Sequence, residues 1–427
     1  MSKKNTLYLF VAFLLELIIL FFLKNELEFI VSPIIFSGAG LFLAIFPYFV
    51  LRKDANAFNY VSKKIDLKYC LSKKHVFTYF IVLVVASIFI ANHTISLHPL
   101  NINQSDIIPF IDEVFVKRFI NGEYVYGNYT GFNYGTFTPG YLPFHWGPYL
   151  FSKLVNLNYQ WVSTIAFLLA CIVYLFYLLK HIQSNWFLLL NVSLPFLVLF
   201  LIYLKGGGSG VQSIEVMVMA YYLLLSVSFF SKNVFVKSIG IVMPLLSRYS
   251  FLFWIPVYFY NFLKSNLKIF FLVSLIVLSI VLLFFVVPFV LPSPEILLKM
   301  NANYITSTVE EWNGQSWQAP GDRPFQLFQG IGFASWFYEF GSGTLVNKIE
   351  LTKTYLFVIS LIAMILLILF YSKIRETIDK DLFSLLALKL MLTIFYALIM
   401  IPYDYLNWVP IIISVVILSR VNYSNKY

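Results

Sequence analysis

The chain has 427 residues, of which 60% are hydrophobic and 12% are charged, whereas soluble domains are roughly 45–50% apolar and about 25% charged. This composition excludes an ordinary soluble protein and predicts a polytopic membrane protein in a lipid bilayer. The formal net charge of +10 is concentrated between apolar stretches, where basic residues orient a chain in a membrane, so no nucleic-acid partner is expected.

A hydrocarbon core takes about 20 mostly apolar residues per helix, and such stretches recur along the whole chain. In chain order they are Leu7–Leu23, Phe29–Leu51, Val76–Thr94, Trp161–Leu179, Trp186–Leu204, Val211–Phe230, Ile269–Leu291, Lys353–Tyr371, Leu382–Ile401 and Leu406–Leu418. Together with Ser238–Leu263 they predict an all-α fold of about 10–12 transmembrane helices, organised as a single membrane domain over residues 1–427.

The loop after the second stretch sets the expected orientation, because it carries seven lysines and arginines against two aspartates. The positive-inside rule makes such a loop cytoplasmic. Both termini are then cytoplasmic, and two long loops, residues 95–160 and 292–352, are extracytoplasmic. Acidic residues concentrate on that outer side, which is where we expect the active site. The abundance of Lys, Asn, Ile and Phe favours a bacterial source, and hence an inner or plasma membrane.

The first outer loop joins a carboxylate to a polar and aromatic surface. Asp106 directly follows the third apolar stretch, and apolar residues then recur at helical spacing from Ile107 to Phe119. This pattern predicts an amphipathic helix lying in the membrane interface. The rest of the loop is dense in Tyr, Gly and Pro and includes His145 and Trp146. Such a surface suits a substrate that is half sugar and half lipid.

Glu113 is the candidate for a second carboxylate, because at about 100° per residue it returns to the helix face of Asp106. The alternative is a solvated helix face on which Glu113 pairs with Lys117, four residues later.

A glycine-rich segment, Gly206–Gly210, follows Lys205 and precedes the next apolar helix. Free N–H groups at a helix N-terminus favour anions, but no Gly-Lys-Ser/Thr sequence follows, which excludes a P-loop. Gln212 and Glu215 are candidates for binding sugar hydroxyls. The alternative is a flexible turn whose lysine reaches to the membrane interface.

Ser238–Leu263 has lysines of the cytoplasmic type on both sides, so a single crossing would invert everything after it. It also contains Pro244, Arg248 and Pro256. We therefore expect a broken hairpin that enters and returns with Arg248 near its turn, since broken backbone at membrane depth is tolerated where it lines a cavity. Arg248 would need an anion or water there. A lipid phosphate suits its planar fork, and reaching to the outer interface is the alternative.

Charged and aromatic residues elsewhere carry weaker signals. The second outer loop is long enough for helices of its own, and its tryptophans could stack on sugars or simply mark the membrane interface. Glu16 and Lys389 are charges inside spanning stretches, where they either pack against a partner or face internal water. The histidines lack the spacing of metal ligands, so no metal is expected.

Three stretches carry a likeness to a known family. The first is Asp106 with the helix after it, followed by Gly122–Tyr126 and Tyr141–Pro143; the second is Gly206–Ile214; the third is Gly240–Tyr249, with Arg248 followed by an aromatic residue. Together they resemble the integral-membrane glycosyltransferases of the GT-C fold. The nearest class uses polyprenyl-phosphate-linked sugars and includes glycosyltransferase family 87, many of whose members are mannosyltransferases.

The resemblance implies transfer of a sugar from a lipid-phosphate carrier to an acceptor on the outer face. Asp106 would be the catalytic base that takes the proton from an acceptor hydroxyl as its oxygen attacks the anomeric carbon. Arg248, helped by Lys205, would bind the leaving lipid phosphate. The candidate contacts to sugar or acceptor are Gln212, Glu215, His145 and Trp146. We therefore predict a hexosyltransferase, with mannose as one candidate sugar, acting on a lipid-linked or cell-envelope glycan without a metal or cofactor.

Other interpretations of the same sequence stay open. Ser105 and Asp106 could simply cap the helix that follows them. An O-antigen-type polysaccharide polymerase would need essential arginines in the two outer loops, which contain only Arg118 and Arg323. A lipid or sugar transporter would show inverted repeats with breaks in both halves, whereas the sequence shows one clear broken hairpin. An ancillary membrane scaffold would not need the long outer loops.

Overall fold

The computed structural model describes residues 3–24, 26–50, 73–100, 108–130, 136–182, 185–206, 208–314, 318–319, 321–329 and 331–424. Asp106, the expected catalytic base, lies outside these residues. Within them the chain is overwhelmingly helical, and the described strands form one antiparallel pair, β1 (Tyr129–Thr130) with β2 (Thr136–Phe137).

Seven of the described helices are long and apolar enough to cross a membrane. They are α1 (Lys3–Ile18) with its π-helical extension η1 (Ile19–Leu23), α2 (Glu28–Val50), α3 (Lys73–Leu97), α7 (Gln160–His181), α8 (Asn185–Lys205), α13 (Leu267–Val281) with its extension η6 (Leu282–Val290), and α17 (Leu345–Ile374). The sequence-based prediction of an all-α, polytopic membrane protein is therefore confirmed.

Shorter helices complete the bundle. They are α9 (Ser209–Gln212), α10 (Glu215–Ser228), α11 (Val234–Leu245), α12 (Ile255–Ser265), α18 (Lys380–Ala397) and α19 (Trp408–Ser424). Short 3-10 turns, η5 (Tyr249–Phe251) and η7 (Asp404–Asn407), lie before α12 and α19.

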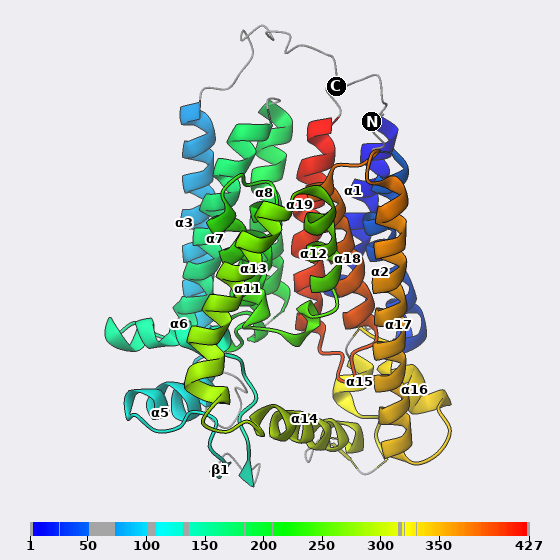
Figure 1. Cartoon of the computed structure of the whole chain (residues 1–427). Coiled ribbons are helices and arrows are strands. Elements are labelled where there is room, and N and C mark those ends of the chain that lie inside the picture. Colours follow the sequence, from blue (N-terminus) through cyan, green and yellow to red (C-terminus); the bar gives the residue numbers. More distant parts are fainter. Residues whose placement is uncertain are drawn as a thin grey trace, which may run out of the picture.

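Helices from the two long loops gather at one end of the bundle, opposite the end where α1 begins and α19 finishes (Figure 1). We call this group the cap. From the first loop it takes a continuous helix, α4 (Ile108–Phe110) with η4 (Ile111–Val116) and α5 (Lys117–Ile120), and then α6 (Pro143–Leu154). From the second loop it takes α14 (Ile296–Asn313), α15 (Phe325–Gln329) and α16 (Ala334–Phe340).

The apolar stripe predicted for the first cap helix is buried at Ile108, Ile111, Val114 and Phe115, and this helix packs against α6.

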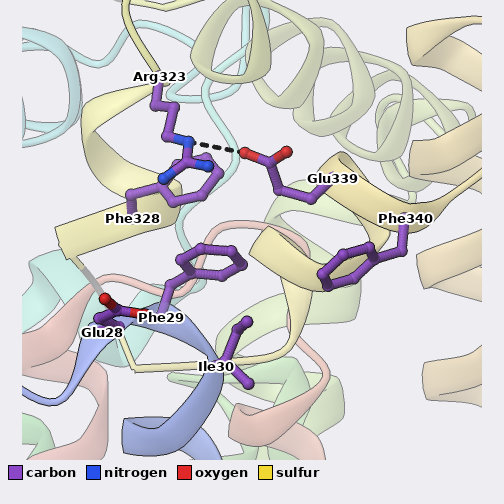
Figure 2. A pocket seen from close by; sticks show the side chains of 7 residues that line it. All are labelled: Glu28, Phe29, Ile30, Arg323, Phe328, Glu339 and Phe340. Atoms are coloured by element: carbon purple, nitrogen blue, oxygen red, sulfur yellow. Dashed lines mark ion pairs between the residues drawn. The ribbon is translucent and has the colours of Figure 1, made fainter.

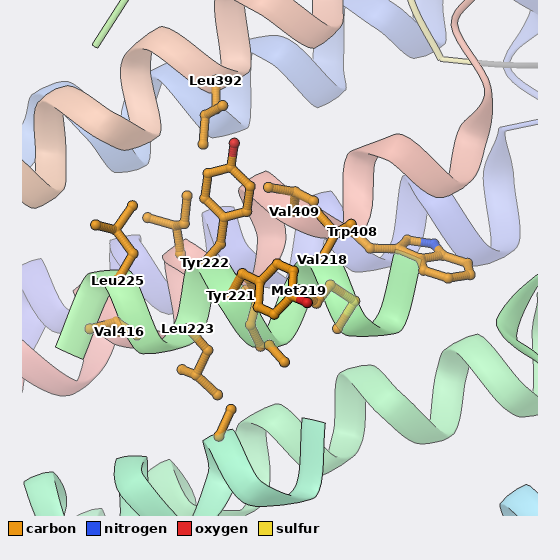
Figure 3. Close-up of a cluster of buried hydrophobic side chains, with 14 of the residues drawn as sticks. Val218, Met219, Tyr221, Tyr222, Leu223, Leu225, Leu392, Trp408, Val409 and Val416 are labelled. Atoms are coloured by element: carbon orange, nitrogen blue, oxygen red, sulfur yellow. The ribbon is translucent and has the colours of Figure 1, made fainter. Parts of the chain in front are cut away.

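Helix α10 lies at the centre of the apolar core. All of its 14 residues except Leu224 are buried, which is the pattern of a helix that is enclosed on every side. It packs against α7, α11 and α19. Figure 3 shows Tyr222 of α10 near Leu392 of α18 and Val409 of α19.

The break predicted within Ser238–Leu263 lies between α11 and α12. Pro256 is in the first turn of α12, where its missing N–H has no helical partner to lose. The two ends of this hairpin that are farthest from its turn both contact the start of α18, because Lys237 Nζ is 3.3 Å from Asp381 Oδ1 and Lys380 Nζ is 3.5 Å from Ser265 Oγ. The chain thus enters and returns at one level, with Arg248 in the connecting turn.

Glu16 and Lys389 form an ion pair between α1 and α18, and both side chains are 0% exposed. Ser414 Oγ donates a hydrogen bond of 2.8 Å to Glu16 Oε2, and Lys389 Nζ donates one of 2.9 Å to the carbonyl of Pro410. Of the two interpretations offered by the sequence, the structure supports packing partners.

We expect Lys389→Met to lower the free energy of unfolding by about 3–5 kcal/mol, because it leaves the Glu16 carboxylate buried without an opposite charge. Thermal unfolding of the detergent-purified protein would measure the loss. The double variant Glu16→Gln with Lys389→Met should recover most of it, since neither buried charge then remains. A double variant as unstable as Lys389→Met alone would contradict this account.

Candidate functional site

Arg248 lies in the turn between α11 and α12, and its side chain is 19% exposed. Helix α11 has 12 residues and α12 has 11, so each arm of the hairpin is at most about 18 Å long at 1.5 Å per residue. A hydrocarbon core is about 30 Å thick, so neither arm is long enough to cross it.

An ion pair with Glu215 holds Arg248 in this position. Nη2 of Arg248 contacts Oε1 of Glu215, at the first residue of α10; the glutamate side chain is 0% exposed and the arginine side chain 19%. Among the described residues, neither Nε of Arg248 nor Oε2 of Glu215 has a hydrogen-bond partner. A guanidinium carries five N–H donors, so this pair leaves donor capacity unused.

Helix α6 closes over the turn through its first residues. The backbone N–H of Phe144 donates a 2.9 Å hydrogen bond to the carbonyl of Leu246, and Nδ1 of His145 lies 3.1 Å from Oγ of Ser247. The Tyr141 ring stacks on the imidazole at 4.9 Å between centroids. The cap is thereby fixed to the residues immediately before Arg248.

Burial holds the pKa of His145 well below its ordinary value, and the positive charge of Arg248 lowers it further. The imidazole is therefore neutral at physiological pH. Because His145 is uncharged, it adds no positive charge beside that of Arg248.

A chain of hydroxyl groups lies on the other side of the turn. Oγ of Ser250 is 3.2 Å from the hydroxyl of Tyr222 on α10 and 3.2 Å from the hydroxyl of Tyr396 on α18. No motif in the sequence marks these three residues. Ser250 is close to Arg248 in the chain, and this closeness could have pointed to it. Tyr396, however, is 146 positions away from Ser250, and no local pattern indicates the contact between these two residues.

Two residues expected to contact sugar are placed differently. Glu215 is fully buried and bonded to Arg248, so it orients the guanidinium and does not face open space. Trp146 is 2% exposed, and its ring packs against Phe115 and Phe289 at 5.9 Å between centroids. The ring of Trp146, which was expected to stack on a sugar, is thus covered by apolar side chains, and Trp146 is a core residue of the cap.

His145 is also buried, and its contacts join α6 to the hairpin. Gln212, at the end of α9, is partly exposed and its amide lies close to Gly208.

Lys205 and Glu113 lie in other surroundings than Arg248. Lys205 is exposed at the end of α8, and its ammonium lies 5.3 Å from the ring centroid of Phe22. Because this contact directs the Lys205 side chain toward η1, the structure gives no support for Lys205 and Arg248 binding the same phosphate. Glu113 pairs with Lys117 at 3.0 Å across one helical turn, which is the alternative that its spacing offered.

Among the described residues, no group of three or more His, Cys, Asp or Glu side chains could hold a metal ion. The site around Arg248 consists of an arginine with unused donors, a buried carboxylate that orients it, and neutral hydroxyl and imidazole groups. Chemically, this arrangement suits an oxyanion such as a phosphate, which a guanidinium can bind through two hydrogen bonds.

We expect acid to destabilise the protein partly through His145. Its pKa is depressed in the folded chain, so the neutral form is retained while the unfolded chain takes up a proton below about pH 6.5. The contribution of His145 to the free energy of unfolding is therefore fully present above that pH. It decreases as the pH falls, by up to about 1.4 kcal/mol per pH unit.

His145→Gln keeps a hydrogen-bonding partner for Ser247 and removes the titration. Thermal unfolding at about pH 7.5 and about pH 5.5 should show a smaller loss for this variant than for the wild type. Equal losses would exclude His145 as a buried neutral group, because the other histidines are the same in both proteins.

In comparisons with known proteins, no protein-family model, no curated protein and no solved structure gives a significant match to this chain.

Proposed function

We propose that this protein is an integral-membrane glycosyltransferase of the GT-C kind, which transfers a hexose from a polyprenyl-phosphate-sugar to a lipid-linked or cell-envelope glycan. The proposal places the reaction on the extracytoplasmic side of a bacterial inner membrane. The observation that carries it is Arg248, held by Glu215 in the turn of a hairpin inside the bundle, with a donor that has no partner among the described residues.

The position of Arg248 supports a lipid-borne anion over a soluble one. Arginine within an apolar bundle is costly, so such residues commonly mark a substrate path or pair with an anion. Glu215 accepts a bond from one nitrogen of the guanidinium, and the remaining donors could bind a phosphate oxygen. A phosphate attached to a membrane lipid could approach this turn from the bilayer, because its chain stays in the hydrocarbon core.

The reaction would proceed by direct displacement at the anomeric carbon. Asp106 would take the proton of an acceptor hydroxyl, whose oxygen forms the new glycosidic bond while the bond from the anomeric carbon to the phosphate oxygen breaks. The polyprenyl phosphate leaves with the electron pair, and Arg248 stabilises its negative charge. Asp106 is assigned from the sequence; the helix that begins at Ile108, two residues later, packs in the cap.

The contacts of Arg118 account for one of the two outer-loop arginines, Arg118 and Arg323, that a polysaccharide polymerase could use. Such an enzyme would need arginines of the outer loops for its chemistry. The guanidinium of Arg118 instead donates hydrogen bonds to the carbonyls of Val125, Gly127 and Asn128, at 3.3, 2.5 and 2.7 Å. These bonds fix the loop after α5, so Arg118 has a structural task.

We expect membranes containing the wild-type protein to transfer radiolabelled hexose from one member of a panel of polyprenyl-phosphate-sugars to an endogenous acceptor. Asp106→Asn should reduce the rate roughly 100- to 10,000-fold, the range for loss of a general base. Arg248→Gln combined with Glu215→Gln removes the phosphate site without leaving a buried charge, and should reduce it by roughly 100-fold or more.

Arg375→Gln is the matched control, because Arg375 pairs with the exposed neighbour Glu376 beyond the end of α17. Transfer at the wild-type rate by the double variant would remove Arg248 from the mechanism. Transfer retained by Asp106→Asn would remove the proposed base. If the wild type used no donor in the panel, the glycosyltransferase proposal would fail, and the polymerase or transporter would become the better account.

A further inference from the structure

A pocket lies in the cap, away from Arg248. It has a volume of about 590 Å³ and lies between the start of α2 and the α15–α16 region. Phe29, Phe328 and Phe340 contribute aromatic rings, and Arg323 and Glu339 contribute charge (Figure 2). In Figure 1, α15 and α16 lie on the opposite side of the cap from α6, which covers the Arg248 turn.

Arg323 is held in one orientation although it lies at the surface. Its Nε is 2.7 Å from Oε1 of Glu339. Its guanidinium carbon also lies 5.1 Å from the ring centroid of Phe29 and 4.9 Å from that of Phe328. An exposed ion pair alone would hold such a side chain weakly, but contacts with two aromatic rings add to it. The contact with Glu339 uses Nε, so the two terminal nitrogens are the donors that a ligand in the pocket would meet.

The aromatic part of the pocket is not covered by the described residues of this chain. Phe340 is 68% exposed, and Figure 2 shows its ring and that of Phe29 bordering the same space as the Arg323–Glu339 pair. Exposed aromatic rings beside fixed polar groups are typical of ligand sites, in which apolar walls supply contact area and a few polar groups fix orientation.

The charge of the lining selects the class of ligand. One arginine, Arg323, faces two glutamates, Glu28 and Glu339, so the sum of +1 and −2 is −1. This balance disfavours an anionic ligand. A neutral sugar fits it, because hydroxyl groups can donate to the carboxylates and accept from the guanidinium, while the C–H face of the sugar ring packs on phenylalanine.

We propose that this pocket binds a neutral glycan through a hexose unit that packs against Phe340 and is hydrogen-bonded by Arg323 and Glu28. The binding itself does not depend on the transfer reaction. Its further identification as the site that holds the acceptor chain away from the transfer centre rests on the proposed function.

Direct binding to the purified full-length protein in lipid nanodiscs tests the proposal. The probes are neutral trisaccharides of glucose, galactose and mannose, with a uronic-acid trisaccharide as the anionic comparison, and saturation-transfer NMR with titration gives the affinities. We expect at least one neutral trisaccharide to bind, and the anionic one to bind more weakly or not at all.

Phe340→Ala should weaken that binding roughly three- to tenfold, the range for losing one aromatic contact. The control is Phe151→Ala, which removes a comparably exposed phenylalanine, 61% exposed, from α6 outside the pocket. It should bind as the wild type does.

Arg323→Gln, which keeps a donor but breaks the contact with Glu339, should weaken binding further than Phe340→Ala. Absence of binding by every neutral probe, stronger binding of the anionic probe, or equal affinities for Phe340→Ala and Phe151→Ala would overturn the proposal. No sugar donor is present in this experiment. Failure of the transfer assay with intact binding would therefore reject only the proposed function, and intact transfer without binding would reject only this pocket.

Discussion

A charge buried among apolar helices has to be paired with an opposite charge, because its desolvation costs several kcal/mol that only a close partner can offset. Two such contacts connect parts of this protein that are far apart in the chain. Glu16 with Lys389 joins α1 to α18, and Glu215 with Arg248 joins α10 to the hairpin turn. Once the helices are packed, these pairs leave little freedom in how α10, α18 and the hairpin lie relative to one another.

The broken hairpin obeys the same constraint for its backbone. A turn inside a membrane protein is tolerated only where other parts of the protein provide hydrogen bonds or a wet cavity. Here Phe144 of α6 donates to the carbonyl of Leu246, and His145 meets Ser247. The cap is therefore part of what makes the break possible. His145 and Ser247 are about 100 residues apart in the chain. Their contact explains why the first loop and the hairpin belong to one site.

The two proposed sites would divide the task of joining a lipid-borne sugar to a glycan. The donor phosphate would be bound by Arg248 within the bundle, where its lipid chain can stay in the bilayer. The glycan would be bound in the cap, by Arg323 and exposed phenylalanines, where its hydroxyl groups remain in water. Such a division would match the two proposed substrates, since one is mostly hydrocarbon and the other is polar.

Several features could be predicted from the sequence because they depend on residues that are neighbours in the chain. Length and uninterrupted apolarity determined which segments become helices, and prolines between basic flanks determined the break with Arg248 in it. The pairing of Glu113 with Lys117 also follows from helical spacing alone, although it was only one of two alternatives.

Partners between distant segments were decided by the tertiary structure. Sequence composition could not show that Glu215 would meet Arg248, or that the ring of Trp146 would be covered by Phe115 and Phe289. It also could not show that Arg323 would lie between Phe29 and Phe328. Such contacts depend on the distances at which helices pack, and local periodicity does not encode those distances. The sequence therefore determined the class of protein and its helical segments, whereas packing decided which polar groups face one another.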